Sequence, residues 1–131
     1  MPPAINFAPI ENATTALADS ARRYERALGS ARTRIAGNAN ALRTLNAKLR
    51  QTESQLTDPA GLPNREWYRH LLYAPGFYTG YSVKTVPGVR ENIEQGHYKD
   101  AEDEVVRMSK ALTRLVAIVD SASADLENLS R

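Results

Sequence analysis

Apolar residues recur along most of this chain at spacings of three and four, the pattern of helices that bury one face. The pattern predicts three long helices, at residues 7–28, 30–56 and 98–129, and one short helix at 89–95. Gly29 is expected to end the first helix, because glycine often follows the last helical residue. The first two helices should then be antiparallel neighbours. Such helices bury their apolar faces only against one another, so the predicted fold is an all-α bundle forming a single domain over residues 1–131.

The apolar stripe on each long helix indicates the expected core. On the first helix it consists of Ile10, Ala13, Leu17, Ala21, Tyr24 and Leu28. On the second it consists of Ile35, Asn38, Leu42, Leu45, Leu49, Thr52 and Leu56. On the last it consists of Ala101, Val105, Met108, Leu112, Leu115, Val119, Ala122, Leu126 and Leu129.

Residues 58–88 interrupt the helical pattern with a long irregular loop. They contain the only tryptophan and four of the six tyrosines, together with four of the seven prolines. Roughly thirty irregular residues are unusual in a compact domain, and such a segment is commonly a binding loop or an interface. Aromatic side chains with polar tips are frequent anchors in both. Composition leaves two roles open for these aromatics: packing the loop onto the bundle, or forming an interaction site.

Composition and charge narrow the function classes. The net charge of +2 is too small to indicate nucleic-acid binding, and acidic residues dilute the lysines and arginines of residues 1–57. The chain has no cysteine, and its two histidines, His70 and His97, lack the spacing of a metal site. The acidic run from Asp100 to Glu104 suits a helix N-terminus, where the helix dipole favours negative charge. No apolar run approaches the roughly 20 residues that span a bilayer, so the isolated chain should be soluble and make no direct membrane contact.

The loop resembles the signature of a known family. It begins Asp-Pro-Ala-Gly-Leu-Pro-Asn-Arg-Glu-Trp-Tyr-Arg-His-Leu-Leu-Tyr-Ala-Pro at residue 58 and ends with Pro-Gly at 87–88. The sequence and spacing are similar to the C-terminal dimerisation domain of the transferrin receptor and glutamate carboxypeptidase II family, over roughly residues 6–129. The Gly-Phe-Tyr-Thr-Gly-Tyr run is most similar to fungal members. The matching positions are Asp58, Pro59, Gly61, Leu62, Pro63, Arg65, Tyr68, Arg69, His70, Tyr73, Ala74, Pro75, Pro87 and Gly88.

The resemblance implies a role within a larger protein. Family members are generally single-pass membrane proteins with a protease-like domain, an apical domain and this helical domain last, on the luminal or extracellular side. The zinc ions of the peptidase members lie in the protease-like domain, so no cofactor is expected in this chain. The chain should be an excised homodimerisation domain without catalytic activity. Its expected partners are the parent's second subunit and the protease-like and apical domains.

One pair of loop positions bears on the substrate of the parent. In the carboxypeptidase members, a Lys-Tyr pair on this loop binds the carboxylates of the substrate's C-terminal residue. By resemblance Tyr81 matches the tyrosine, whereas Gly80 stands at the lysine position, and Lys84 cannot be assumed to replace it. The resemblance therefore implies a pocket wall around Tyr81, and without the cation at position 80 the parent need not prefer glutamate. The parent would be a peptidase of other specificity or an inactive relative.

Two further functions stay open from the sequence. The first is a free-standing helical module that binds another protein through the loop 58–88. The second is a small enzyme that uses His70, His97 or the loop tyrosines, although the chain has no Gly-x-Ser-x-Gly motif and no serine with an obvious histidine partner.

Overall fold

The structure is a computed structural model that describes residues 4–56, 73–75, 83–85 and 87–131. Its elements in chain order are α1 (Ala8–Ala36), α2 (Ala39–Ser54), β1 (Tyr73–Pro75), β2 (Val83–Thr85), α3 (Pro87–Glu94) and α4 (Tyr98–Leu129). The fold is all-α, as predicted, apart from one antiparallel ladder formed by the two short strands.

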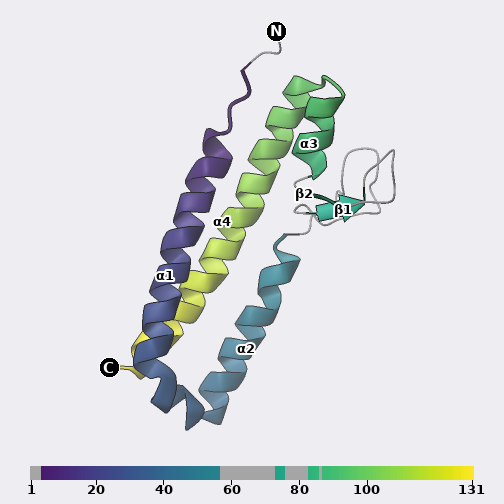
Figure 1. Cartoon of the computed structure of the whole chain (residues 1–131). Coiled ribbons are helices and arrows are strands. Elements are labelled where there is room, and N and C mark those ends of the chain that lie inside the picture. The colour runs from purple at the N-terminus through teal and green to yellow at the C-terminus, as the bar shows by residue number, and fades with distance from the viewer. Residues whose placement is uncertain (1–3, 57–72, 76–82, 86) are drawn as a thin grey trace.

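The last helix, α4, is the element against which the others pack, with α1 and α2 on either side of it (Figure 1). α1 and α2 run antiparallel, as expected, and α4 runs parallel to α1. Hydrogen bonds join the parallel pair at both ends: the backbone N of Asn6 donates to Glu102 Oε1 at 3.0 Å, and Arg34 Nη1 donates to the carbonyl of Leu129 at 2.6 Å. α2 packs mainly on α4 and makes few contacts with α1.

The predicted end of the first helix at Gly29 is wrong, because α1 continues to Ala36. No atom lies within 4 Å of the position that a Cβ of Gly29 would occupy, so this glycine faces open space within the helix. Beyond it, Ala31 and Ile35 are buried in the core shared with α4. Their burial outweighs the low helix propensity of one glycine, which is about 1 kcal/mol relative to alanine.

The turn between α1 and α2 falls at Gly37 and Asn38 instead. The Oδ1 atom of Asn38 accepts a hydrogen bond from the backbone N of Ala41 at 3.0 Å, which satisfies one of the free N–H groups at the start of α2. The second helix therefore spans Ala39–Ser54 rather than 30–56.

Small side chains form the contact of α1 with α4. The buried residues of α1 are Ala13, Ser20, Ala27, Ala31 and Ile35. Of the six residues in the predicted stripe, only Ala13 is buried, while the large side chains beside it are half-buried. Small residues let two helix backbones approach closely, so they occupy the inner face and the larger apolar residues lie at its margin.

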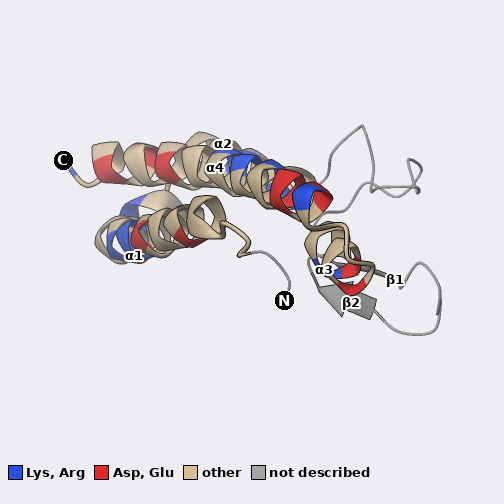
Figure 2. Ribbon diagram, turned by 90° about the horizontal axis from the view of Figure 1, so that it is seen from above, with Lys and Arg blue, Asp and Glu red and all other residues tan. Residues whose placement is uncertain are grey.

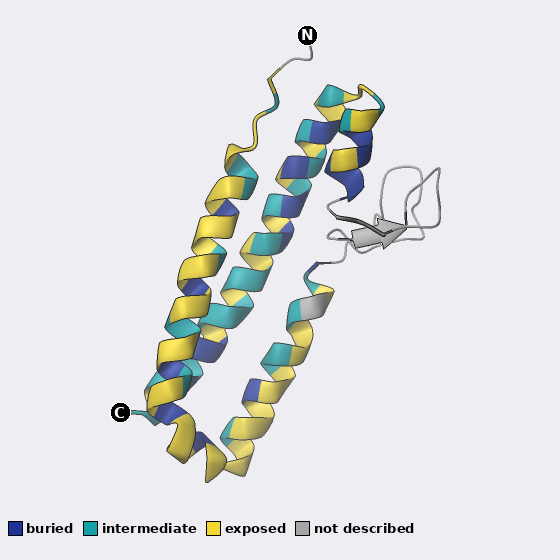
Figure 3. Ribbon diagram, in the orientation of Figure 1, coloured by how far each residue is buried: buried dark blue, intermediate teal, exposed yellow. Residues whose placement is uncertain are grey.

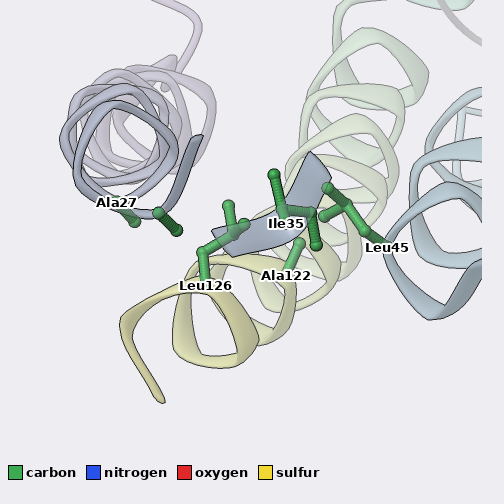
Figure 4. Close-up of a cluster of buried hydrophobic side chains, with 6 residues drawn as sticks. Ala27, Ile35, Leu45, Ala122 and Leu126 are labelled. Atoms are coloured by element: carbon green, nitrogen blue, oxygen red, sulfur yellow. The ribbon is translucent and has the colours of Figure 1, made fainter. Parts of the chain in front are cut away.

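The main core cluster joins all three long helices near the α1–α2 turn (Figure 4). It consists of Ala27, Ala31 and Ile35 from α1, Leu45 from α2, and Ala122 and Leu126 from α4. Leu126 is fully buried, and burying a leucine side chain contributes about 1.5–3 kcal/mol. This cluster confirms the predicted stripe at the C-terminal end of α4.

The short helix α3 ends in a glycine turn that leads directly into α4. Gly96 has φ of 76°, which is left-handed backbone that favours glycine. The backbone N of His97 donates to the carbonyl of Asn92 at 2.7 Å, and the N of Gly96 donates to that of Ile93 at 3.1 Å. These two bonds form a Schellman motif, which satisfies the last carbonyls of α3 and reverses the chain.

Candidate interaction surface

An apolar groove lies between the N-terminal half of α1, the end of α2 and the middle of α4. Its volume is about 320 Å³. Its lining is apolar except for one threonine and consists of Ile10, Thr14, Leu17, Leu56, Met108, Leu112 and Leu115. Leu56 and Met108 are buried, whereas Ile10, Leu17, Leu112 and Leu115 remain half-buried. The groove thus exposes the large apolar side chains that the sequence predicted for the core.

Residues 112–121 of α4 are apolar on more than one face, yet none of them is buried. Within residues 112–121, all of which the structure describes, every side chain is half-buried or exposed (Figure 3). The half-buried residues include Leu115, Val116, Ile118 and Val119. A helix that is apolar around its circumference is normally buried on all sides. This part of α4 therefore has the composition of a helix that another surface covers.

Polar contacts on both flanks of α4 hold α1 and α2 in place. Ser20 Oγ on α1 donates a hydrogen bond to Asp120 Oδ1 at 2.6 Å. On the α2 side, Lys48 forms an ion pair with Asp125 and donates from Nζ to Ser121 Oγ at 2.8 Å. These contacts leave the groove between the helices as a fixed feature of the fold.

The arginines of α1 take part in similar contacts. The guanidinium of Arg23 lowers the pKa of Glu127, mainly through their hydrogen bond, and Glu127 in turn raises the pKa of Arg23. Arg22 pairs with Asp19 on the same helix, at 2.5 Å. Positive and negative residues are interspersed along α1 and α4 rather than gathered into one basic patch (Figure 2). This distribution is typical of a solvated helix surface.

The first turn of α3 is packed tightly against α4. Pro87 is fully buried, and Gly88 is buried beside the side chain of Glu104. Asn92 Nδ2 donates to the carbonyl of Gly88 at 2.7 Å in a buried position. The Pro-Gly pair of the signature therefore lies at the junction between the strand ladder and the helices.

The comparison with known families decides the assignment. The model of the transferrin receptor-like dimerisation domain matches residues 5–120. The chain belongs to this family. The match confirms the resemblance that the loop signature indicated. The all-α arrangement of the structure agrees with the bundle predicted from the sequence.

Curated relatives of the dimerisation domain are much longer proteins. The chain is 40% identical over 77 residues to a probable glutamate carboxypeptidase of Arthroderma benhamiae, covering 59% of this chain and 11% of that protein. It is 35% identical over 78 residues to a probable glutamate carboxypeptidase of Arabidopsis thaliana, covering 54% and 12%. It is 39% identical over 69 residues to an inactive zinc metalloprotease of Schizosaccharomyces pombe, covering 53% and 9%. The chain thus matches about a tenth of the length of these relatives.

The structure describes part of the signature of the dimerisation domain. Tyr73, Ala74 and Pro75 form β1, and Pro87 and Gly88 begin α3. The remaining signature positions, and the candidate pocket positions, lie outside the described residues; they are Asp58, Pro59, Gly61, Leu62, Pro63, Arg65, Tyr68, Arg69, His70, Gly80 and Tyr81. The predicted roles of these residues stay predictions.

Other candidate chemistry can be placed on the described part of the domain. His97 is exposed and stands immediately before α4. In the acidic run, Lys99 forms an ion pair with Asp103 at 2.6 Å, and Glu102 accepts the bond from Asn6. Among the described residues, no group of three or more histidine, aspartate or glutamate side chains could hold a metal ion. Of the described helices, none is long and apolar enough to span a membrane.

Sequence reasoning missed the groove of the dimerisation domain. It assigned Ile10, Leu17, Leu112 and Leu115 to the core because they are large, apolar and regularly spaced. The small residues of α1 could have revealed its inner face, because Ala13, Ser20 and Ala27 are spaced seven residues apart. A seven-residue repeat is the period of a helix seam.

Proposed function

We propose that this domain joins two subunits of a zinc metallopeptidase-like protein, and that the second copy covers the apolar groove. The proposal is supported by the family assignment together with the half-buried apolar surface around Leu112, Leu115 and Ile118. An apolar surface continuous over a groove and an adjoining helix is typical of a protein–protein interface. The second copy is the favoured occupant because dimerisation names the family to which the chain belongs.

Sedimentation of the 131-residue chain tests this proposal. The wild type should be dimeric, and Leu115→Glu, which places a charge in the groove, should shift it to monomer. Leu17→Glu, on the α1 side of the groove, should do the same. Val106→Glu is the matched control, because Val106 lies on α4, is 42% exposed and does not line the groove. Circular dichroism should show wild-type helix content in all three variants.

Two results would overturn the groove as the seat of the second copy. One is a folded Leu115→Glu chain that dimerises as tightly as the wild type. The other is a wild type that stays monomeric while its groove binds a hydrophobic dye. The second result would identify another domain of the same subunit, or a different protein, as the partner that covers the groove.

A second role rests on the loop. In the proposed parent, the segment with Gly80 and Tyr81 closes one wall of the substrate cleft, and zinc is held in the protease-like domain. The parent is a single-pass membrane protein with this domain on its luminal or extracellular side, and the isolated domain has no activity. Support comes from the signature spacing and from relatives named as glutamate carboxypeptidases.

This second role has its own test in the parent protein. Tyr81→Phe should raise KM for a substrate with a free C-terminal carboxylate and leave its dimerisation unchanged. Gly80→Lys should improve the preference for C-terminal glutamate, because it restores a cation where carboxypeptidase members have one. Unchanged kinetics in both variants would contradict the pocket-wall role.

A further inference from the structure

The contact of Gly88 with Glu104 leaves no room for a side chain on α3. A Cβ placed on Gly88 would lie 2.4 Å from Oε2, 2.9 Å from Cδ and 3.1 Å from Cγ of Glu104. Carbon atoms that are not bonded prefer separations of about 3.5–4.0 Å. Because Cγ is also too close, turning the carboxylate alone would not clear the overlap. Either the Glu104 side chain must shift, including a small movement at Cγ, or α3 must move away from α4.

The Glu104 side chain is held in this position. It is 14% exposed and forms an ion pair with Arg107, one turn along α4, at 3.3 Å. Arg107 is itself only 20% exposed. Displacing Glu104 would therefore disturb a largely buried charge pair, which is unfavourable for both partners.

The strand ladder directly precedes α3 in the chain, and β2 contacts α3. Residue 86 alone separates the end of β2 at Thr85 from the start of α3 at Pro87. β2 pairs with β1 over three residues, with Tyr73 opposite Thr85 and Pro75 opposite Val83. Contacts thus connect Glu104 on α4 with Gly88 on α3, and α3 with strand β2 of the ladder. Pro75 and Val83, which flank residues 76–82 in the chain, are paired in this ladder.

We propose that Gly88 and Glu104 are positioning residues for the β1–β2 ladder, and that they set the ladder's place relative to α4. Because Gly88 has no side chain, α3 can lie close to α4, and the contact with the Glu104 side chain limits how close it lies. Through the ladder this pair sets the positions of Pro75 and Val83, the described residues that flank 76–82 in the chain. The consequence for the substrate cleft rests on the proposed function of that loop, whereas the positioning itself does not.

Hydrogen–deuterium exchange on the 131-residue chain tests the positioning. Gly88→Ala should speed exchange in β1 and β2 roughly tenfold or more, since overpacking of a close contact shifts the backbone. Exchange in α1 and α2 should stay unchanged. Gly88→Ala combined with Glu104→Ala should exchange more slowly in the ladder than Gly88→Ala alone, because the second change removes the atoms that the methyl group meets.

Two controls separate packing from charge and from a general loss of stability. Glu104→Gln removes the charge but keeps the shape of the side chain and an oxygen that can accept a hydrogen bond from Arg107, so ladder exchange should stay within about twofold of the wild type. Gly29→Ala, which meets no atom within 4 Å, should leave the ladder unchanged. Wild-type ladder exchange in Gly88→Ala would overturn the proposal. The proposal would also be overturned if the ladder of the double variant exchanged as fast as that of Gly88→Ala. This holds even if Gly88→Ala speeds exchange throughout the chain.

The expected effect on the substrate cleft is measured separately, through the kinetics of the parent protein. In the parent peptidase, Gly88→Ala should raise KM more than it lowers kcat, with sedimentation equal to that of the wild type. If exchange responds as expected but KM does not, the positioning stands and the pocket-wall role of the loop fails. If the wild-type chain is monomeric, the dimerisation proposal fails and the exchange result is unaffected.

Discussion

Arg23 of α1 and Glu127 of α4 form a two-point ion pair across the parallel helices. Nε lies 2.7 Å from Oε1, and Nη2 lies 3.0 Å from Oε2. Two parallel hydrogen bonds between a planar guanidinium and a carboxylate constrain rotation as well as distance. Ser20 and Asp120 lie about one turn earlier on α1 and about two turns earlier on α4, and the two contacts together set the register of α1 against α4.

The Arg23–Glu127 pair predicts a specific loss of stability in acid. Because the folded-state pKa of Glu127 lies below its ordinary value of 4.5, the pair stabilises the fold above that pH, and its contribution is lost as pH falls through the lowered pKa. Glu127→Gln should therefore be less stable than the wild type near neutral pH and should show a smaller drop between pH 6 and pH 3. Urea unfolding at several pH values measures both.

The matched control for this prediction is Glu25→Gln on the exposed face of α1. It should keep the acid response of the wild type, because the Arg23–Glu127 pair is intact in this variant. The effect of Glu127→Gln should also shrink in high salt, because both side chains of the Arg23–Glu127 pair are 38% exposed and screened by ions. An equal acid response in wild type and Glu127→Gln would show that the pair does not contribute.

The two glycines at Gly29 and Gly96 should respond oppositely to alanine. Gly29→Ala should stabilise the chain by about 0.5–1 kcal/mol, because Gly29 lies inside α1 with open space around it. Gly96→Ala should destabilise it by about 1–2 kcal/mol, because φ at this position is left-handed. Thermal unfolding of the two variants measures the difference. A destabilised Gly29→Ala would contradict the continuous α1.

This pair of glycines shows where the sequence could predict the fold and where it could not. Gly29 follows Leu28 and Gly96 follows Gln95, and each stands directly after a helix that the sequence predicts. Gly96 ends α3 because its backbone bonds close a Schellman turn. Gly29 does not end α1, because Ala31 and Ile35 find a buried site on α4 that no local pattern reveals. Local sequence thus indicates a possible stop, and the long-range contact decides it.

The small side chains on α1 give a second prediction about packing. Ala31→Leu should destabilise the fold by about 1–3 kcal/mol, because Ala31 is fully buried against α4 and the added atoms overpack the seam. Ala21→Leu on the same helix is exposed and should change the free energy of unfolding by less than about 0.5 kcal/mol. Similar changes in unfolding free energy for the two variants would contradict the observed α1–α4 contact, in which Ala31 is buried and Ala21 is exposed.

The main core cluster gives a prediction that compares one buried leucine with one exposed leucine. Leu126→Ala should cost about 2–5 kcal/mol, because it opens a cavity at a fully buried site. Leu42→Ala, at a side chain that is 40% exposed on α2, should cost less than about 1 kcal/mol. Urea unfolding with both variants measures the two values, and a ranking in the reverse order would contradict the observed core.

The candidate surface was less predictable than the helices, for a physical reason. Periodicity identifies an apolar face but does not say which protein covers it. Leu112 and Leu115 belong to the same stripe as Leu126, yet only Leu126 is buried within this chain. The loop signature indicated the family from residue spacing alone, and the closeness of Gly88 to Glu104 supplies a reason for one of its glycines.

The parallel course of α1 and α4 places the two termini at opposite ends of the fold (Figure 1). The segment before α1 lies beside the start of α4, where Asn6 contacts Glu102, and the C-terminus follows Leu129, the last residue of α4. The 32 residues of α4 extend roughly 48 Å at about 1.5 Å per residue. A segment joined before α1 and one joined after α4 would therefore be separated by about this distance.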